Sequence, residues 1–482
     1  MLKNDLLKSK KEAFSMSEQR KPRRKNYADS RKVNPFFASP LATVLTCMLA
    51  FLAVGLLIKC AVDLVDNIAD RPSTNISAST TTETVAGENA PITVVSSATI
   101  SSQGDLLMHK PVIDTCKGKD GKYDFESIFR YVKSYVSGYD YAVANFETTL
   151  GGPDHPYQGN PSFNTPDTFA DELVDTGFDM LLTANNHCAD TTATGILRTL
   201  EQLRSRNLAT VGTQKDANEQ DFVVIEVNGI RIGVSCYTYA TDETDDGRPS
   251  LNRNSFLSKK GIVNYYMENK LDRFYGEVEA QLNAMEQQGV DATIFYVHWG
   301  VEYETEENEL QNQMAQKLCD MGVDVIIGGH PHVVQPIELL QSKRDPSHRT
   351  VCIYSLGNVV SNQREGIDPS FEGGFTEDGV IFNVTFEKYS DGTAGLAGVD
   401  VLPTWVNMHT TDGVKEYNVL PLDVSRESQW EEMFDISNET AKKAKDSFDR
   451  TMKILGDGLE ECQKHLDNVK QLRLLGDTLP DV

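Results

Sequence analysis

Between Pro91 and about Val406, short runs of β-branched residues alternate with segments in which apolar residues recur every three or four positions. This alternation is typical of a layered α/β domain. Three helices are predicted from such apolar stripes, and a buried strand follows each of them. The predicted pairs of helix and strand are 167–176 with 178–183, 271–285 with 293–297, and 304–321 with 323–327.

The last part of the chain has a different pattern. Residues 380–389, a turn at 390–392 and the apolar run after it predict a closing β-hairpin. Residues 425–475 are charged, follow a helical pattern and contain no proline. We therefore expect an α/β domain over 92–406 and a C-terminal helical extension over 407–482, for which the residues indicate no chemistry.

An uncharged apolar segment lies near the N-terminus. Residues 41–58 contain no charged side chain, and together with the residues from Pro35 onward they are long enough to cross a hydrocarbon layer of about 30 Å. A cleaved signal peptide is the alternative, but the apolar run is long and no small-x-small cleavage site follows it. A buried core helix is disfavoured because the segment has no polar face.

The charges beside this segment predict its orientation. Residues 1–35 carry 11 Lys and Arg against 4 Asp and Glu, although the whole chain has a net charge of −25. A basic flank is typical of the cytoplasmic side of a membrane span. We therefore expect a cytoplasmic tail over 1–35, a transmembrane signal anchor over 36–60, a Ser/Thr-rich linker over 61–91, and an extracellular domain beyond it. The acidic balance excludes nucleic acid as the main partner.

Polar clusters follow five apolar runs that are predicted as strands, at residues 92–101, 141–144, 180–184, 293–297 and 323–327. Because the carboxyl ends of strands in an open α/β sheet gather at one edge, residues far apart in sequence meet there in one crevice. The clusters are Gly104-Asp105, Asn145-Phe146-Glu147, Asn185-Asn186-His187, His298-Trp299-Gly300-Val301-Glu302 and Gly328-Gly329-His330-Pro331-His332.

Taken singly, each cluster has an ordinary structural explanation. A Gly-Asp pair is a common turn, and a lone histidine such as His298 is more often a hydrogen-bonded core residue than a ligand. Taken together, four of the nine histidines fall at strand ends, with carboxylates at two others, which favours a metal site. Nitrogen and oxygen donors without cysteine suit Mn, Fe or Zn, and six or more ligands are enough for two divalent ions.

The same motifs, in the same order, resemble the CapA capsule-synthesis family across roughly residues 92–405. Besides the clusters above, the resemblance rests on the sequence Cys188-Ala189-Asp190 after His187, on Tyr303, and on the motif Tyr354-Ser355-Leu356-Gly357-Asn358. It implies a fold similar to the calcineurin-like metallophosphatases, a four-layer α-β-β-α sandwich of two sheets between helices. It also implies a centre with two metal ions.

The resemblance implies six metal ligands, of which Glu147 would lie at or near the bridge between the ions. Asp105 would hold one ion, and His332 would face the ion other than the one held by His298 and His330. The six expected ligands are Asp105, Glu147, Asn186, His298, His330 and His332.

The resemblance also assigns residues that would contact the substrate. His187 corresponds to a proton donor rather than a ligand. The other residues expected to bind substrate are Glu302, Tyr303, Ser355 and Asn358.

One motif departs from the metallophosphatase pattern. Those enzymes begin with Asp-x-His, whereas Leu107 stands two residues after Asp105 and His109 stands four residues after it. The first metal site would therefore lack a nitrogen ligand unless His109 supplies it.

Three functions fit these residues. The first is metal-assisted hydrolysis or transfer in the synthesis or export of poly-γ-glutamate, the polymer to which the resemblance points. The second is a non-enzymatic, membrane-tethered accessory protein that passes the polymer outward with capsule synthase or export subunits. The third is a phosphoesterase acting on another envelope substrate. The part of the chain after residue 35 has a net charge of −32 and would repel an anionic polymer at long range, which favours a local site.

Overall fold

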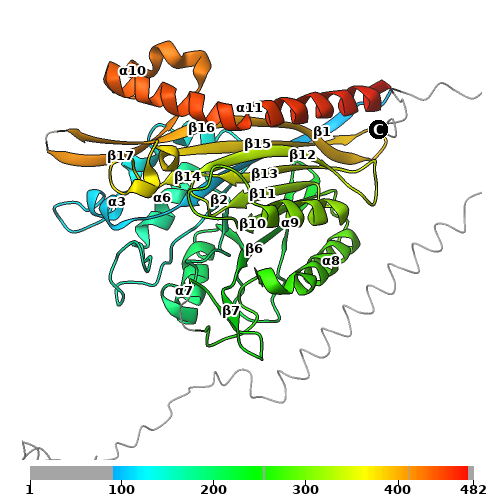
Figure 1. The fold of residues 1–482 in the computed structure, drawn as a ribbon, viewed down its shortest axis with the longest axis horizontal. Coiled ribbons are helices and arrows are strands. Elements are labelled where there is room, and N and C mark those ends of the chain that lie inside the picture. Colours follow the sequence, from blue (N-terminus) through cyan, green and yellow to red (C-terminus); the bar gives the residue numbers. More distant parts are fainter. Residues whose placement is uncertain (1–90, 253–255, 412, 476–482) are drawn as a thin grey trace, which may run out of the picture. The chain divides into compact units, whose positions relative to one another are not determined.

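Two β-sheets form the described part of the chain, which covers residues 91–252, 256–411 and 413–475 of a computed structural model (Figure 1). The first sheet has the strand order β17-β16-β15-β1-β2-β3-β4, and β14 pairs with β1. Its strands are β1 (Val94–Leu106), β2 (Tyr141–Asn145), β3 (Met180–Leu182), β4 (Ala209–Val211), β14 (Asn358–Val360), β15 (Asp378–Tyr389), β16 (Ala394–Thr411) and β17 (Val414–Pro421).

The second sheet has the order β12-β13-β11-β10-β6-β5, and β9 pairs with β6. In both sheets the central strands are parallel, as expected for α/β units, and antiparallel hairpins extend the edges. The strands are β5 (Val223–Val227), β6 (Ile230–Tyr239), β9 (Tyr265–Tyr266), β10 (Ala292–His298), β11 (Val325–Gly329), β12 (Val334–Gln341) and β13 (Arg349–Leu356); a separate ribbon pairs β7 (Asp242–Glu243) with β8 (Pro249–Ser250).

Helices cover the outer faces of the two sheets, and an apolar core lies between the sheets. In that core, Ile100 and Val143 of the first sheet belong to one buried cluster with Ile294 and Val325 of the second. A second cluster joins the first sheet to α3, α4 and α6, and a third joins the second sheet to α8 and α9. The helices are α3 (Lys110–Thr115), α4 (Glu126–Phe129), α5 (Lys133–Val136), α6 (Thr168–Thr176), α7 (Thr192–Arg204), α8 (Leu271–Gln287), α9 (Glu309–Asp320), α10 (Trp430–Met433) and α11 (Asn438–Leu475), with 3-10 turns at Glu268–Lys270, Pro369–Phe371, Phe375–Glu377 and Val424–Gln429.

The helices and strands predicted from apolar spacing are confirmed, with one boundary shifted. Helix α6 ends at Gly177, whose φ of 104° is the left-handed conformation that glycine adopts without strain. Helix α9 begins at Glu309 rather than near Glu304, because Asn308 and Gln311 form a reciprocal capping box that stops the helix there. The predicted hairpin is formed by β15 and β16.

The C-terminal region differs from the expected helical extension. The boundary predicted between residues 406 and 407 falls inside β16, and β17 continues the first sheet to Pro421. Only after these strands does the chain become helical. Helix α11 then packs along β16 of the first sheet and β12 of the second, so it joins the edges of both sheets (Figure 1).

A buried ion pair holds α11 against β15. Asp378 accepts hydrogen bonds from Arg450 Nε and Nη2, each 2.7 Å long, and from Ser447 Oγ at 2.6 Å. Burial raises the pKa of Asp378 to about 6, even though Arg450 favours the charged form. The pair therefore secures the position of α11, and loss of Arg450 would leave the buried carboxylate of Asp378 without its cation.

We expect Arg450→Met to lower the free energy of unfolding by roughly 3–5 kcal/mol at pH 8, because it leaves the Asp378 carboxylate without its charged partner. This decrease in stability should be smaller at pH 5. A folded-state pKa that lies above the unfolded value penalises folding progressively as the pH rises through it. Denaturant unfolding at both pH values measures the effect. Lys445→Ala, which breaks an exposed pair with Asp449 on the same helix, should change stability by less than about 1 kcal/mol.

The predicted cytoplasmic tail, signal anchor and linker (1–35, 36–60 and 61–91) lie outside the described residues, apart from Pro91. Among the helices of the described part, none combines the length and the apolar character needed to cross a membrane.

Candidate metal centre

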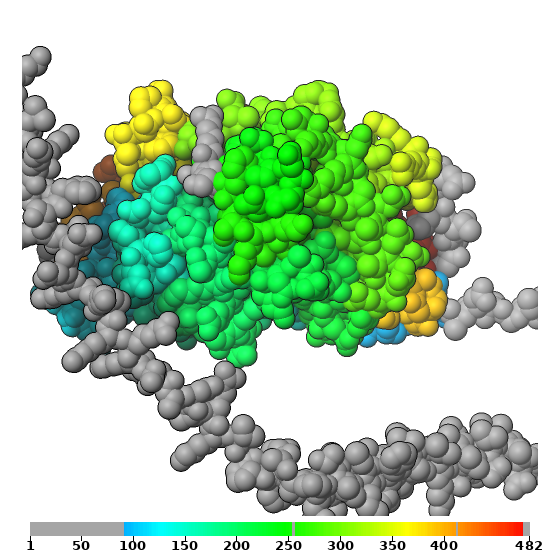
Figure 2. All heavy atoms as spheres, turned by 90° about the horizontal axis from the view of Figure 1, so that it is seen from below, coloured from blue at the N-terminus to red at the C-terminus, as the bar shows by residue number. Residues whose placement is uncertain are grey.

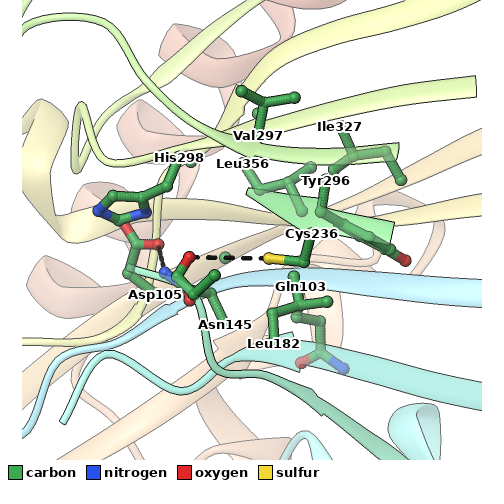
Figure 3. Close-up of a pocket in the computed structure, with 14 residues that line it drawn as sticks. Gln103, Asp105, Asn145, Leu182, Cys236, Tyr296, Val297, His298, Ile327 and Leu356 are labelled. Atoms are coloured by element: carbon green, nitrogen blue, oxygen red, sulfur yellow. Dashed lines mark hydrogen bonds between the residues drawn. The ribbon is translucent and has the colours of Figure 1, made fainter. Parts of the chain in front are cut away.

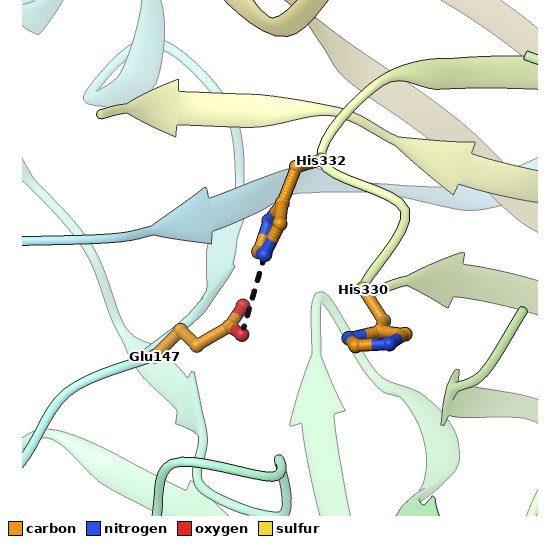
Figure 4. A group of neighbouring side chains, drawn as sticks. All are labelled: Glu147, His330 and His332. Atoms are coloured by element: carbon orange, nitrogen blue, oxygen red, sulfur yellow. Dashed lines mark ion pairs between the residues drawn. The ribbon is translucent and has the colours of Figure 1, made fainter. Parts of the chain in front are cut away.

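Loops at the ends of strands from both sheets bring the predicted ligands together. Asp105 lies near the end of β1, Glu147 follows β2, and His298 is the last residue of β10. His330 and His332 follow β11 and point toward Glu147 in Figure 4. All five side chains are at least 95% buried. A space this enclosed favours strong electrostatic interaction between the groups it contains.

The side chains form two groups with the spacing of metal ligands. Glu147, His330 and His332 make one group, and Asp105, Glu147 and His298 make the other; within each group the ligand atoms lie within 4.8 Å of one another. Glu147 belongs to both. The sequence prediction placed His330 with His298 instead, and the rings of those two lie closer (4.8 Å between centroids) than the rings of His330 and His332 (5.9 Å), so the sharing of ions among the histidines stays a prediction. Glu147 is thus the residue common to both groups, and its expected bridging role stays a prediction.

Two ligand atoms have no hydrogen-bond partner among the described residues. These are Glu147 Oε1 and His330 Nδ1, and both are buried. Glu147 Oε1 lies 3.5 Å from His298 Nε2 and 3.9 Å from His332 Nε2. A buried polar atom without a partner costs about 1–3 kcal/mol, and metal coordination would remove that cost. The donor atoms present therefore fit divalent cations with a preference for nitrogen and oxygen.

The charges in the group are set for cation binding. Burial would raise the pKa of Asp105, but a 2.9 Å hydrogen bond from His332 Nδ1 and the charge of that ring hold it below its usual value. For the His332 ring, burial alone would lower the pKa, because it disfavours the charged form, but the carboxylates of Glu147 and Asp105 raise it to about 9. Metal binding would therefore displace a proton from His332.

His330 has the opposite electrostatic environment. Burial, together with the neighbouring rings of His298 and His332, holds the pKa of His330 well below its usual value. Its imidazole is accordingly neutral at physiological pH, which is the form that binds a metal ion.

The backbone carrying these two histidines is strained. His330 has a φ of 98° and His332 a φ of 58°, in the left-handed region that residues with a Cβ rarely occupy. Such residues cost on the order of 1–3 kcal/mol each and cluster at functional sites. Asn358 stabilises the loop, because its Nδ2 donates to the carbonyl oxygen of His332 at 3.1 Å.

A small cavity lies between the sheets directly beside Asp105 and His298 (Figure 3). Its volume is about 20 Å³, enough for a single water molecule. Asn145 lies at its edge and donates from Nδ2 to Asp105 Oδ1 at 2.7 Å and to Glu147 Oε2 at 3.1 Å. Asn145 thus fixes both carboxylates of the two ligand groups, a role that the sequence interpretation did not assign to it.

His187 lies outside both ligand groups, and its expected role as a proton donor stays a prediction. Its Nδ1 is 2.7 Å from Asp190 Oδ2, and the Phe163 ring meets it edge-on at a centroid distance of 4.5 Å. Asp190 Oδ2 also accepts the backbone N–H of Phe163 at 2.6 Å. Asp190 occupies Nδ1, so Nε2 is the ring nitrogen left for chemistry.

Asn186, the remaining expected ligand, faces His298. Its Oδ1 lies 2.8 Å from His298 Nε2, and its Nδ2 donates to Asn252 Oδ1 at 2.9 Å. The oxygen is thus directed at the ligand group, as expected for a metal-binding carboxamide. Asn252 was missed by the sequence interpretation because it lies in a loop 65 residues from His187, with no motif around it.

Two residues expected to contact substrate are buried and bonded within the protein. Ser355 is 0% exposed, and Asn358 is 1% exposed with its Nδ2 shared among four acceptors in neighbouring loops. Both therefore support the loops instead of facing a ligand. Glu302 is exposed, and Tyr303 is half-buried with its ring 6.2 Å from that of His332, so these two remain at the site entrance.

His109 does not join the ligand groups. Its Nδ1 accepts the backbone N–H of Asn362 at 3.2 Å, and burial lowers its pKa to about 4. The nitrogen donor in the ligand group of Asp105 is instead His298, and His332 Nδ1 is hydrogen-bonded to Asp105 Oδ2 at 2.9 Å.

Three loops border the centre. They contain Phe163, Asn252 and Phe371, and the last of these stacks edge-on against Tyr303 at 5.2 Å. Figure 2 shows the cyan, green and yellow parts of the chain, to which these loops belong, together on one face of the molecule.

The fold and these residues define a mixed α/β protein with a buried cluster of histidines and carboxylates suited to divalent metals. Residues 99–363 match the family model for the bacterial capsule synthesis protein PGA_cap, and this match covers more than half of the chain. The protein belongs to that family, as the motifs predicted. The matched region includes every residue predicted to form the site.

Two curated relatives have capsule-related names. The chain is 28% identical over 264 residues to the PGA biosynthesis protein CapA of Bacillus subtilis (strain 168), a match that covers 54% of this chain and 62% of that protein. The chain thus spans less than two thirds of that relative. It is 25% identical over 348 residues to the capsule biosynthesis protein CapA of Bacillus anthracis, covering 69% and 75% respectively.

A crystal structure, that of TT1561 of Thermus thermophilus, was also matched. The match covers 60% of this chain and 94% of that one, with 10% sequence identity and a TM-score of 0.29. A similarity at that level does not establish a shared fold, so the expected likeness to metallophosphatases stays a prediction.

Proposed function

We propose that this protein acts in the synthesis or export of a poly-γ-glutamate capsule. It would do so through a dinuclear metal centre that hydrolyses a bond of the polymer or transfers a segment of it to an acceptor. The observation that carries the proposal is the position of Glu147 in both ligand groups, with one carboxylate oxygen buried and unbonded. Membership of the capsule-synthesis family and the names of the two relatives support the choice of polymer.

The ligands would be Asp105, Glu147, His298, His330 and His332, with Asn186 beside His298. Two divalent ions, whether Mn, Fe or Zn, supply Lewis acidity and an activated water when they are bound. A cationic centre also attracts an anionic polymer locally, although the surrounding chain is acidic.

The protein's own contribution would be orientation and proton transfer. Asn145 holds one oxygen of Asp105 and one of Glu147, which leaves Glu147 Oε1 without a hydrogen-bond partner among the described residues. Asp190 fixes the ring of His187 at Nδ1, so the proton given to the departing group of the substrate would be the one on Nε2 of the doubly protonated ring. Tyr303 and Glu302 at the entrance would contact the polymer beyond the reacting bond.

A test compares metal-loaded and chelator-treated full-length protein on poly-γ-glutamate, on phosphodiesters and on α-linked peptides. We expect cleavage or transfer of poly-γ-glutamate with added Mn²⁺, and none after chelation. Turnover of phosphodiesters alone would favour the phosphoesterase alternative. Two bound ions without turnover of any of the three would contradict the enzymatic proposal and favour an accessory protein of polymer export.

We also propose a single-pass membrane anchor near residues 36–60, with the metal-binding domain outside the cell and in contact with membrane-bound capsule synthase or export subunits. The basic segment 1–35 supports the orientation. Protease added to intact cells should then degrade the large domain and spare only a short N-terminal fragment. Full protection of the domain would contradict this topology.

A further inference from the structure

A loop residue outside every motif contacts two of the proposed site residues at once. Asn252 follows β8 and points its carboxamide at Asn186 and His187. Its Oδ1 accepts from Asn186 Nδ2 at 2.9 Å, and its own Nδ2 lies 3.1 Å from His187 Nδ1 and 3.4 Å from His187 Nε2. Its backbone φ of 49° is left-handed, a conformation that asparagine tolerates better than most residues.

The contact with Asn186 determines which end of that carboxamide faces the ligand group. An asparagine side chain has an oxygen that binds cations and an amino group that does not, and rotation by half a turn exchanges them. Asn252 Oδ1 accepts hydrogen bonds but cannot donate them, so it selects the rotamer in which Asn186 Nδ2 faces the loop. Asn186 Oδ1 then faces His298 Nε2 at 2.8 Å.

The contact with His187 has a different geometry. An atom in the plane of the ring cannot approach both ring nitrogens so closely without overlapping the carbon between them. The Asn252 amino group therefore lies over the face of the imidazole and leaves the ring edges to other partners. One of these partners is Asp190, at Nδ1.

We propose that Asn252 is a positioning residue for the metal centre: it orients the Asn186 carboxamide so that oxygen, not nitrogen, is offered to the ion beside His298. The proposal rests on the proposed function, because it requires that this centre bind metal. It assigns Asn252 no contact with the ion itself. Hydrogen-bond partners of this kind typically contribute 10–100-fold to metal affinity.

The test is the affinity for Mn²⁺ of the full-length protein, measured by calorimetric titration. Asn252→Ala removes the acceptor, and we expect the affinity for the ion beside His298 to fall by about 10–100-fold. Asn252→Asp retains two acceptor oxygens and should bind Mn²⁺ within about threefold of the wild type. Equal losses in the two variants would overturn the proposal, because an acceptor at this position would then not matter.

A matched control isolates the effect of the backbone. Asn207 is exposed, has a φ of 64° and is separated from the centre by the length of α7, so Asn207→Ala repeats the loss of an asparagine from a left-handed position. We expect it to leave Mn²⁺ affinity unchanged and to lower the melting temperature about as much as Asn252→Ala. Unchanged affinity in Asn252→Ala would contradict the role of Asn252 alone, whereas a wild type that binds no Mn²⁺ would contradict the proposed function.

Discussion

Replacing Glu147 with glutamine is expected to remove both metal ions together. Among the described residues, Glu147 is the one shared by both ligand groups, and its unbonded Oε1 is 3.5 Å from His298 Nε2 and 3.9 Å from His332 Nε2. A neutral amide in place of a bridging carboxylate removes charge from both positions. We expect each affinity to fall by more than the roughly 10–100-fold that loss of an outer hydrogen-bond partner costs.

Elemental analysis after dialysis at a fixed concentration of free Mn²⁺ measures the effect. His332→Ala, which removes a ligand from one group only, should retain the ion beside Asp105 and His298 and so bind about half as much metal. Glu302→Gln removes an exposed carboxylate at the entrance and should bind as much as the wild type. Half occupancy in Glu147→Gln would show that this residue belongs to one site and that the bridge is wrong.

The same variant has a distinct effect on stability. A buried carboxylate is costly unless it is paired or bound to metal, and the glutamine side chain is neutral. The metal-free variant loses the pair of Glu147 with His332 and should unfold at a lower temperature than the metal-free wild type, while added Mn²⁺ should stabilise only the wild type. This contrast separates a lost ligand from a damaged fold.

The position of the ligand residues at strand ends predicted that they lie close together. This prediction depends on the strand topology and not on the packing of individual side chains. Each of Asp105, Glu147 and His298 follows or ends a β-branched run, and parallel strands place such ends at one edge of a sheet. The sequence did not reveal that the residues come from two different sheets. It could not, because that depends on how the sheets face each other through the core of Ile100, Val143, Ile294 and Val325.

Motif membership was a weaker guide to the role of each residue. Ser355 and Asn358 share a motif with a predicted site, yet their burial and hydrogen bonds give them a supporting role. Asn252 is the opposite case, since no pattern surrounds it and its role follows only from a contact between distant loops. The helical extension predicted from residue 407 begins with the end of β16 and with β17. The sequence did not predict these strands, because the alternation of apolar and polar residues there is short and interrupted by polar residues.

His187→Ala is expected to lower turnover by about 10²–10⁴-fold while the protein keeps its metal ions and its fold. His187 lies outside both ligand groups, and Asp190 at 2.7 Å orients its ring, so the substitution removes a proton donor without removing a ligand. The measurement is turnover and metal content on the same preparation, using the substrate identified for the wild type. His155→Ala, an exposed histidine in the neighbouring loop, serves as the control and should retain full activity.

His187 is held by contacts to Asp190, Phe163 and Asn252, so it could act either as an acid or as a support for its loop. Measuring turnover and metal content together distinguishes three results. Lost turnover with retained metal supports a positioned acid. Lost metal would mean that the His187 ring instead supports the loop that carries Asn186, the expected ligand beside His298. Retained metal with polymer export equal to the wild type would remove His187 from any mechanism and favour an accessory protein, in which bound ions hold the carboxylates of the polymer without breaking a bond.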